Sequence, residues 1–596
     1  MSKPRTSSLR ALRALVPFVQ VYRNRMAVGL ACVILSSAIA SAIPWLLRRA
    51  VNALEAGEPP AELWRIAAAM VGITLVTGVL RFQMRNILNA ISRWVEYDLR
   101  NAMFRQLVTL DAGFFGRNRT GDLMARLTND LSAVRMVAGP AIMYLVNTIA
   151  GGIFALVFMV RISPSLTGVA VLPMVLLPIV MAVLGSLIHK RFEAVQEHFG
   201  VMTTHAQENI SGARIVRAFR QEAAEQSHFA ALNDEYLRRN MGLARLYGLM
   251  SPGLQLLAGI GAVAVLGLGG MATLRNEITV GDFVAFGLFL GMLTWPLIAL
   301  GWVINLFQRG AASMHRINEV LCATASVVSP QNAALLPAHA SRGRAIEFRD
   351  VGYHYPVATP GDAPRWVLRN VSFTVPAGAT VGIVGATGSG KSALMDLVPR
   401  FWNPQEGQIL LDGVPIETLP LDALRSTIGY VPQETVLFSD TILSNLTYGG
   451  NDDAAALEAA AVAQLDAAVV DLPDGYQTML GERGINLSGG QKQRAAIARA
   501  LARDPQVVLL DDALSAVDTG TEAAILRGLR EELTGRTALI ASHRVSAVRD
   551  ASWIVVLDEG RIVEQGTHDM LAAARGRYWQ LLRRQQVSDE LDAVTA

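Results

Sequence analysis

The sequence predicts a membrane protein in two parts, an all-α membrane-spanning half followed by a soluble α/β half. The chain has 596 residues, which is more than one hydrophobic core usually organises. Hydrophobic residues make up 52% of the chain and charged residues only 17%, whereas charged residues are about a quarter of a soluble protein. Part of the chain is therefore expected to lie in lipid. Long apolar runs are confined to the first half, and strands alternate with helices in the second.

The apolar runs have the length of transmembrane helices, since a span across the hydrocarbon core needs roughly 20 apolar residues. There are six candidates: Met26–Leu47, Ile66–Phe82, Val137–Val160, Leu166–Ile188, Met250–Leu274 and Phe283–Leu306. An even number of spans places both ends of this half on one side, and the basic N-terminus predicts that this side is the cytoplasm. A large buried helical core is the alternative, but six such runs are too many for it.

The connections between the spans are unequal in length. Those on the outer side are short, whereas the two on the inner side are long, polar and helix-patterned. We therefore expect the transmembrane helices to continue past the bilayer as cytoplasmic stalks. Two stretches look like docking turns, Phe114–Asp130 and Ala206–Glu222, with breaks offered by Gly121 and Gly212. From spacing alone, an ordinary solvated charged face is the alternative.

Shifts in composition predict the domain limits. The membrane half is expected to cover residues 1–322, a linker rich in Ala, Ser and Pro residues 323–345, and the soluble half residues 346–584. Residues 585–596 read as a frayed polar tail. The net charge of +3 is too small to indicate a nucleic-acid partner.

The strongest motif in the soluble half is the glycine loop GATGSGKS. It follows a β-branched strand, Thr380–Val384, and opens into a helical pattern over Ala393–Phe401. In this context backbone N–H groups close around phosphates, and an unliganded glycine turn is the alternative. The cradle is expected to consist of Gly385, Ala386, Thr387, Gly388, Ser389, Gly390, Lys391, Ser392 and Ala393. Lys391 would reach the β- and γ-phosphates, and the Ser392 hydroxyl would ligate Mg²⁺.

Other candidate residues follow predicted strands. The apolar strand Val507–Leu510 ends in Asp511, and a carboxylate at this edge of a parallel sheet is suited to bind Mg²⁺. His543 lies just past a second strand, Thr537–Ala541. Tyr355 follows a strand and precedes a proline, so its ring is placed to stack on a purine.

A second anion cradle lies between these elements, at the LSGGQ stretch that ends in Ser488–Gln491. Ser and two Gly residues at the start of a helix present backbone N–H groups to an anion. A second cradle in one domain makes sense if it serves a nucleotide held by another copy. The sequence therefore predicts a dimer with ATP sandwiched at its interface.

Taken together, these motifs resemble the nucleotide-binding domain of an ABC transporter. The resemblance is carried by GATGSGKS, by Gln433 in VPQE, by LSGGQ, by VVLLDD, by SAVD (Ser515–Asp518) and by His543. The six spans, with FFGRNRTGDLMARLTNDL and GARIVRAF, resemble an ABC exporter half-transporter. The resemblance covers nearly the whole chain. It implies a six-helix transmembrane domain of the exporter type, then an α/β P-loop ATPase domain, and ATP hydrolysis that drives transport.

The resemblance also implies roles for individual residues. Tyr355 would stack on adenine, Gln433 would sense the metal and the attacking water, Asp511 would bind Mg²⁺ and His543 would contact the γ-phosphate. Ser488, Gly489, Gly490 and Gln491 would cap the nucleotide of the partner chain. The two long inner connections would carry coupling helices that grip the nucleotide-binding domains, one of them the partner's.

One residue departs from the family pattern. The position after Asp511 is normally Glu, the general base for the attacking water, but here it is Asp512. The shorter side chain pulls the carboxylate back by roughly 1 Å or more, and misplacement of that size can cost ~100-fold in rate. We therefore predict a heterodimer in which this chain carries a slow, degenerate site and its partner supplies the catalytic Glu. A homodimeric exporter or lipid flippase with two equivalent sites is the alternative.

The transport direction and location follow from the same pattern. The order of membrane domain then ATPase domain favours export over import, and the six spans exclude a soluble ATPase of the DNA-repair type. The chain is expected in the cytoplasmic membrane, in contact with lipids, with its N-terminus and ATPase domain in the cytoplasm. The apolar spans suit hydrophobic or amphipathic substrates such as drugs, lipids or peptides, although lipid-facing helices require the same residues.

Overall fold

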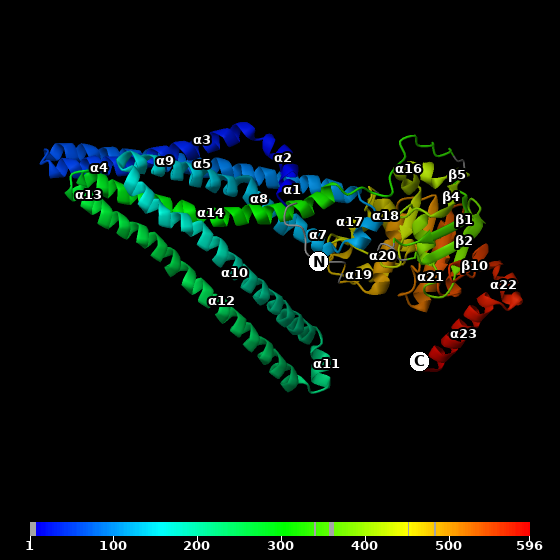
Figure 1. Ribbon diagram of the computed structural model, residues 1–596. Coiled ribbons are helices and arrows are strands. Elements are labelled where there is room, and N and C mark those ends of the chain that lie inside the picture. The colour runs from blue at the N-terminus through cyan, green and yellow to red at the C-terminus, as the bar shows by residue number, and fades with distance from the viewer. Residues whose placement is uncertain are drawn as a thin grey trace. The chain divides into compact units, whose positions relative to one another are not determined.

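The computed structural model describes residues 8–338, 341–356, 363–450, 452–481, 484 and 486–595. The chain divides into two compact units (Figure 1). The membrane unit comprises Met1–Val108 and Thr120–Ala323, and the soluble unit comprises Thr109–Arg119 and Thr324–Ala596. The short segment Thr109–Arg119 thus belongs to the soluble unit although it lies in the first half of the sequence.

The membrane unit is entirely helical in its described part. Its α-helices are α1 (Ser8–Ala11), α2 (Val16–Gln20), α3 (Arg23–Ala40), α4 (Ala42–Glu55), α5 (Pro60–Thr109), α7 (Thr120–Ala125), α8 (Leu131–Met136), α9 (Ile142–Ile162), α10 (Pro164–Ser211), α11 (Ala213–Ala218), α12 (Glu222–Ala264), α13 (Gly270–Leu274) and α14 (Val280–Leu321). Single π-helical turns join several of them, at Arg126–Asp130, Val137–Ala141 and Val265–Gly269.

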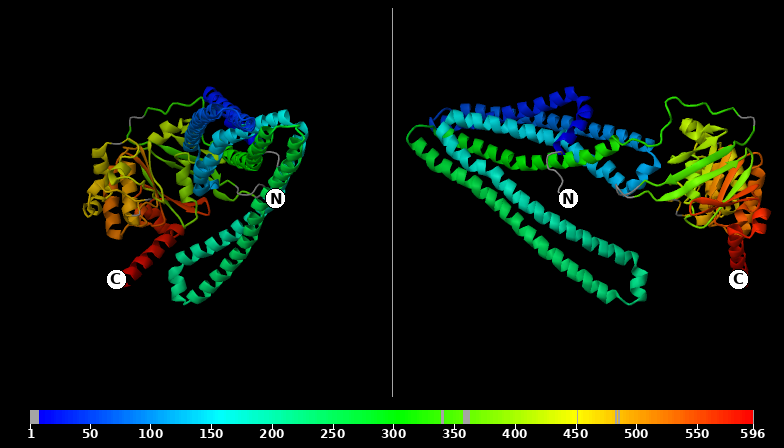
Figure 2. Two further views of the ribbon diagram at one scale, coloured as in Figure 1. Left: turned by 90° about the vertical axis from the view of Figure 1, so that its left-hand side faces the viewer. Right: turned by 45° about the vertical axis from the view of Figure 1, so that its right-hand side comes forward.

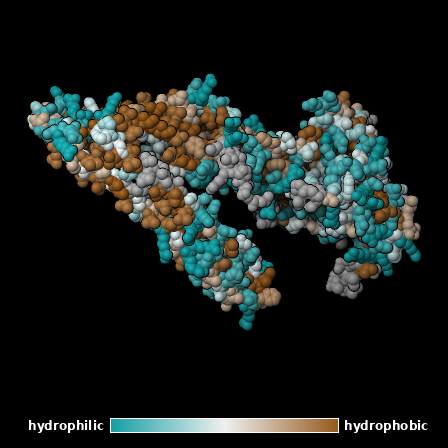
Figure 3. Space-filling model, viewed as in Figure 1, coloured by the Kyte–Doolittle hydropathy of each residue, from teal (hydrophilic) through white to brown (hydrophobic). Residues whose placement is uncertain are grey.

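The six apolar runs fall within these helices, which confirms the predicted helical membrane domain. Three stretches are long and apolar enough to cross a membrane, Arg23–Glu55, Pro60–Thr109 and Thr120–Ile162. Shorter apolar stretches at Pro164–Pro173, Gly259–Leu274 and Val280–Leu293 mark the remaining three runs in the described residues. Figure 3 shows apolar side chains gathered on this unit and hydrophilic ones along the end of α10 and α12.

Several helices extend well beyond the predicted spans, as expected for stalks. Helix α5 has 50 residues, which at 1.5 Å per residue is about 75 Å, more than twice the ~30 Å hydrocarbon core. Helices α10 and α12 lie side by side, with α11 at their far end (Figures 1 and 2). Gly212 ends α10 and separates it from α11, as predicted.

The first inner turn differs from the prediction. Gly121 lies in the first turn of α7, and the break before that helix falls at Asn118 and Arg119, two residues ahead of the predicted glycine. The chain also turns at Leu110 and Asp111, where the Asp111 side chain accepts a hydrogen bond from the Phe114 N–H (3.0 Å) and caps α6 (Ala112–Arg117). The short helix therefore begins just before the predicted docking stretch.

The soluble unit contains two sheets. An antiparallel sheet has the order β2-β1-β4-β5, and a larger, mainly parallel sheet has the order β10-β9-β3-β8-β7-β6. The strands are β1 (Ile346–His354), β2 (Trp366–Val375), β3 (Thr380–Val384), β4 (Glu406–Leu411), β5 (Val414–Pro415), β6 (Ile428–Val431), β7 (Val507–Asp511), β8 (Thr537–Ser542), β9 (Trp553–Asp558) and β10 (Arg561–Gly566). The first two strands, β1 and β2, pair in antiparallel orientation.

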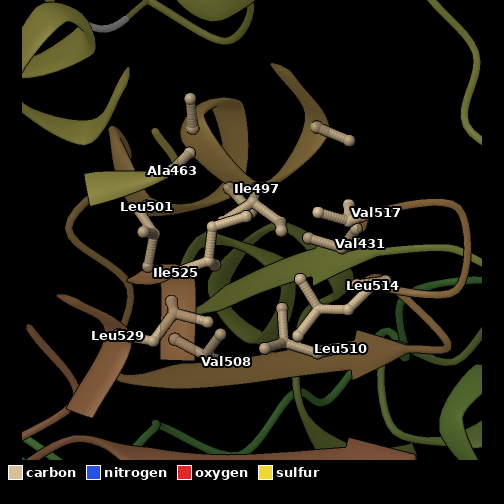
Figure 4. Packing of buried hydrophobic residues seen from close by; sticks show 14 of the residues in the cluster. Val431, Ala463, Ile497, Leu501, Val508, Leu510, Leu514, Val517, Ile525 and Leu529 are labelled. Carbon is tan, nitrogen blue, oxygen red and sulfur yellow. The ribbon is translucent and has the colours of Figure 1, made fainter. Parts of the chain in front are cut away.

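Helices cover the parallel sheet, which explains why its central strands read as continuous apolar runs. The helices of the unit are α6, α15 (Lys391–Leu397), α16 (Leu421–Ser426), α17 (Ile442–Leu446), α18 (Asp453–Val462), α19 (Asp466–Val470), α20 (Gly489–Leu501), α21 (Thr519–Glu532), α22 (His568–Ala574) and α23 (Arg577–Thr595). Figure 4 shows part of the core, where Ile497 of α20 and Ile525 of α21 lie near Val508 and Leu510 of β7.

The two ends of the soluble unit can be compared with the predicted linker and the predicted C-terminal tail. In the described residues, no helix or strand lies between Leu321 and Ile346, the region expected to be a linker. The expected tail, residues 585–596, begins inside α23 instead of fraying at 585. The Gln585 side chain accepts a hydrogen bond from the Val545 N–H at 2.7 Å, so the packed part of this unit extends at least to Gln585.

Candidate functional site

The glycine loop follows β3 and has a backbone that excludes side chains at key points. Gly388 and Gly390 have positive φ angles of 83° and 103°, which favour glycine. A Cβ atom on Gly385 would lie 2.2 Å from the carbonyl oxygen of Leu557. Helix α15 starts directly after the loop, at Lys391, and ends at Leu397, four residues before the predicted end. The loop therefore brings its backbone N–H groups and the Lys391 side chain together.

Lys391 is buried beside the loop. Its Nζ donates hydrogen bonds to the carbonyl oxygens of Gly385 (2.9 Å) and Ala386 (3.1 Å). Burial lowers the pKa of the ammonium group, and the carboxylates of Asp512 and Asp511 oppose this shift. A cation held at the mouth of a loop of backbone N–H groups is an arrangement that binds phosphate.

Asp511 ends β7 and is nearly inaccessible, with 2% of its surface exposed. Burial raises the pKa of its carboxyl group to about 6, against a lowering hydrogen bond from the Ser392 side chain. Within the described residues, Oδ1 of Asp511 has no hydrogen-bond partner. A carboxylate oxygen without a partner beside a hydroxyl fits a hard cation, and Mg²⁺ is typically held by one or two carboxylates together with substrate phosphates. No cluster of three or more His, Cys, Asp or Glu side chains suited to a metal was found in the described part.

Asp512 contacts His543 across two adjacent strands. The parallel register pairs Asp511 of β7 with Ala541 of β8. Asp512 and His543, which follow these strands, therefore lie at the same edge of the sheet. Oδ1 of Asp512 accepts hydrogen bonds from the His543 N–H (3.1 Å) and lies 2.8 Å from His543 Nδ1. Asp512 has a φ angle of 48°, which is uncommon for a residue with a side chain. Its short carboxylate is therefore directed toward the histidine.

Sequence reasoning missed Gln493, which orders the segment after Asp512. This buried side chain donates to the Asp512 carbonyl oxygen (3.3 Å) and to Ser515 Oγ (2.9 Å), and it accepts from the Ala516 N–H (2.9 Å). It lies two residues beyond the LSGGQ motif, on α20. A buried glutamine facing away from the motif gives no distinctive pattern in one sequence.

Gln433 and Tyr355 lie on the borders of the site. Gln433 is exposed and comes two residues after β6, whose last residue, Val431, pairs with Leu510, the residue before Asp511. Tyr355 is 45% exposed and meets the Trp402 ring edge-on, with centroids 5.6 Å apart and an interplanar angle of 85°. Burial raises the pKa of the Tyr355 hydroxyl. Trp402 is thus an aromatic neighbour of Tyr355 that no motif in the sequence indicates.

The LSGGQ segment caps α20. The Ser488 hydroxyl accepts from the Gln491 N–H (3.2 Å), and the Gln491 side chain accepts from the Ser488 N–H (2.7 Å). This reciprocal box fixes the exposed helix start. A Cβ atom on Gly490 would lie 2.8 Å from the Ala516 carbonyl oxygen, so the helix start packs on the segment that Gln493 orders.

Helix α6 is part of the soluble unit, and two contacts hold it there. The Asp111 carboxylate accepts hydrogen bonds from the Ser326 N–H, from Ser326 Oγ (2.6 Å) and from the Val327 N–H (3.3 Å). Burial opposes ionisation of Asp111, but these bonds and that from Phe114 hold its pKa below the usual value. Gly113 is buried against the Trp402 ring. These contacts are made by Asp111 and Gly113, which lie just ahead of the predicted docking stretch, Phe114–Asp130.

Comparisons with known proteins agree with this architecture. Residues 26–297 match the ABC transporter transmembrane region, and residues 368–515 match the ABC transporter family. The chain is 39% identical over 581 residues, 97% of its length and 98% of the relative's, to a probable multidrug resistance ABC transporter ATP-binding/permease protein, YheI, of Bacillus subtilis. It is 38% identical to the multidrug resistance-like ATP-binding protein MdlA of Escherichia coli, over 88% of each chain.

A lipid transporter and a solved structure extend the comparison. The chain is 34% identical to the ATP-dependent lipid A-core flippase of Syntrophus aciditrophicus, over 97% of this chain and 95% of the relative. It matches the structure of a bacterial Atm1-family ABC exporter with ATP bound, with a TM-score of 0.78 and 28% identity, over 95% of this chain and 99% of the other. ATP is therefore the nucleotide, and its hydrolysis is coupled to transport. The chain belongs to the ABC exporters, multi-pass membrane proteins in which one polypeptide joins a helical transmembrane domain to an ATP-binding domain.

Proposed function

We propose that this chain is one half of a heterodimeric exporter of hydrophobic or amphipathic compounds, and that its own ATP site hydrolyses slowly. The observation that carries the proposal is the contact between Asp512 and His543. One carboxylate oxygen, Oδ1, is shared by the main-chain N–H and the Nδ1 of His543. A Glu side chain would reach one methylene further toward an attacking water. Misplacement of a catalytic group by ~1 Å can cost ~100-fold in rate.

The remaining site residues would bind ATP and Mg²⁺ without that base. In the proposed complex, Tyr355 stacks on the adenine ring and Lys391 holds the β- and γ-phosphates. Ser392 and Asp511 would hold Mg²⁺, which would shield the phosphate charge. Gln433 would contact the metal and the attacking water, and His543 would contact the γ-phosphate. The partnerless Oδ1 of Asp511 beside Ser392 supports the metal assignment. ATP would therefore remain bound at this site for a long time, because the site would cleave it slowly.

The competent site would use this chain's second cradle. The exposed helix start at Ser488–Gln491, which the capping box fixes, would cap ATP bound to the partner, while the partner supplies Glu next to its own Mg²⁺ ligand. Two bound ATP molecules would hold the domains together and move the stalks from an inward- to an outward-facing arrangement. This coupling requires that ATP bind the closed state more tightly than the open state, because equal affinity shifts no population.

The soluble unit offers a groove for a coupling helix of the partner. A cavity of about 370 Å³ is lined by the aromatic side chains of Phe401, Tyr430, Phe438 and Tyr448, among others. Phe438 and Tyr448 are exposed and stack at a centroid distance of 4.8 Å. This chain's own second turn, α11, exposes Ile215, and Phe219 follows it, exposed, so a partner turn of the same kind would bring apolar side chains to an apolar groove.

The names of the relatives support the proposed substrate class, and the exposed apolar side chains of the spans support a location in the membrane. The relatives include proteins named for multidrug resistance and a lipid A-core flippase, and these names support a hydrophobic or amphipathic substrate for this chain. Exposed apolar side chains on the spans, such as Leu75 and Leu172, suit a lipid environment. We place the protein in the cytoplasmic membrane with its N-terminus and ATPase domain in the cytoplasm, in accord with the basic residues before the first span.

The proposal is tested by ATP turnover of the purified full chain in nanodiscs, alone and mixed with a candidate partner. The candidate is a similar chain from a neighbouring reading frame with Asp-Glu after its VVLL-type strand. We expect slow turnover alone, fast turnover in the mixture, and dye transport by the mixture only. Robust turnover of the chain alone, unchanged in Asp512→Ala, would support a homodimeric exporter or lipid flippase instead.

A further inference from the structure

Trp402 lies between the adenine side of the ATP site and helix α6. It follows α15, the helix that Lys391 begins, by five residues. On one side its ring meets Tyr355 edge-on at 5.6 Å, and Tyr353 packs against it at 6.1 Å. The indole is partly buried against the core of the soluble unit, which restricts its movement.

On its other side, the indole packs against the backbone of α6. A Cβ atom built on Gly113 would lie 3.0 Å from Trp402 Cζ3 and 3.5 Å from Cη2, and also 3.1 Å from Oδ1 of Asp111, the cap of α6. At this position no side chain separates the helix from the ring. By contrast, a Cβ atom on Gly116, in the same helix, would meet no atom within 4 Å. The contact is therefore specific to one face of α6.

The segment around Trp402 also holds the linker that α6 grips. Asp111, the cap of α6, binds Ser326 and Val327, and a guanidinium nitrogen of Arg400 lies 3.5 Å from the Val328 carbonyl oxygen. Arg425 fixes Arg400 in turn by donating to its carbonyl oxygen at 2.9 Å. Helix α6, the linker and the end of the α15 segment thus meet within a few residues.

We propose that Trp402 is a positioning residue that transmits the occupancy of this chain's own adenine pocket to its own coupling helix, α6. The inference rests on the proposed ATP site. When the Tyr355 ring stacks on a purine, the indole in edge contact with it must adjust, because packed rings leave no free space between them. The Gly113 backbone lies directly on that indole, so α6 and the end of α5 follow. A site that holds ATP without rapid cleavage would then still govern the stalk.

The test measures the exposure of α6 in the full chain. A cysteine replaces Phe115, an exposed residue of α6, after Cys32→Ser and Cys322→Ser, and its rate of modification by a maleimide is measured with and without ATP. The variants Gly113→Val and Gly116→Val add the same β-branched side chain to the same helix, so they share its helix-propensity cost. Binding of a fluorescent ATP analogue is measured in parallel.

In the reference chain and in Gly116→Val, we expect ATP to change the modification rate by about threefold or more, a coupling of the size carried by packed networks. In Gly113→Val and Trp402→Ala, the ATP effect should be lost while the analogue binds within about twofold of the reference affinity. Trp402→Tyr, which retains a planar ring, should restore most of the response. These results would assign transmission to the ring, since a structural role alone would not be rescued by ring shape.

Two different failures are distinguishable. If the reference chain does not bind the ATP analogue, the proposed ATP site is wrong. If it binds and responds, but Gly113→Val and Gly116→Val behave alike or Trp402→Ala keeps the full response, the transmission through Trp402 is wrong while the ATP site stands.

Discussion

Oδ1 of Asp512 lies 2.8 Å from Nδ1 of His543 and also accepts the main-chain N–H of the same histidine. The two residues are held there by the in-register strands β7 and β8, which end side by side. The residue proposed as the base for the attacking water and the residue proposed to contact the γ-phosphate are therefore joined through one carboxylate oxygen. In the proposed site, the length of the side chain at position 512 would decide whether a carboxylate oxygen reaches the attacking water.

Asp512→Glu is expected to accelerate ATP hydrolysis at this chain's own site by about 10- to 100-fold, because the extra methylene returns the carboxylate toward the water. Asp512→Asn, which keeps the length of Asp, is the matched control and should not accelerate it. Single-turnover hydrolysis by the full chain measures the effect. An unchanged rate in Asp512→Glu would show that the residue at this position does not limit the site.

Asp511 gives a prediction for pH. Burial raises its pKa to about 6, above the ordinary value near 3.8, so the folded state favours the protonated form. This contribution to stability is present below about pH 4 and is lost as pH rises through about 6. Without metal or ATP, Asp511→Asn should therefore melt higher than wild type at pH 7.5, and the difference should narrow toward pH 5. With Mg²⁺ and ATP, the wild type should gain stability and Asp511→Asn should not, so the wild type should then have the higher melting temperature. A variant that still melts higher than the wild type under these conditions would contradict the Mg²⁺ assignment.

Local signals explain which parts the sequence predicts. The glycine loop is recognisable because its conformation demands Gly at fixed positions, as the φ angles of Gly388 and Gly390 show. The apolar runs are recognisable because spanning helices need them. Each of these constraints is contained within a few tens of residues.

The missed features depend on partners far away in the chain. Gly113 contacts Trp402, and no pattern near either residue indicates the other. Gln493 has its role only because α20 packs against the segment after β7. Gly121 was expected to break a helix, but glycine costs a helix only about 1 kcal/mol, and it lies in the first turn of α7, just after the break at Asn118 and Arg119.

Gln493→Ala should disturb the segment that precedes α21. The change removes hydrogen bonds to the Asp512 carbonyl oxygen, Ser515 and Ala516, and leaves buried groups unpaired at a cost of about 1–3 kcal/mol each. We expect a lower melting temperature and slower hydrolysis in the mixture with the partner. Gln464→Ala, at an exposed position, serves as the control. Equal melting temperatures for the two variants would show that Gln493 is dispensable.

Arg344 and Asp412 form a buried ion pair at 2.6 Å, with side chains 7% and 8% exposed. Arg344→Met would leave a buried carboxylate without its guanidinium and should lower stability by about 3–5 kcal/mol. The double variant Arg344→Met/Asp412→Leu should be less damaging, because it buries no unpaired charge. The double-mutant cycle compares free energies of unfolding, measured by denaturing the detergent-solubilised chain while a probe in the soluble domain reports its unfolding. Additive losses would show that the pair does not interact.

Tyr448 gives the test of the groove proposed for the partner's coupling helix. Its ring is 57% exposed and stacks on Phe438, so Tyr448→Ala removes contact area for a docking helix with little loss of core packing. We expect the melting temperature of the soluble unit to stay near that of wild type, while transport by the mixture with the partner falls about tenfold or more, the effect of losing an aromatic anchor. Leu457→Ala, on α18 and outside the groove, is the control. Transport at wild-type levels in Tyr448→Ala, or an equal loss in Leu457→Ala, would place the partner's docking surface elsewhere.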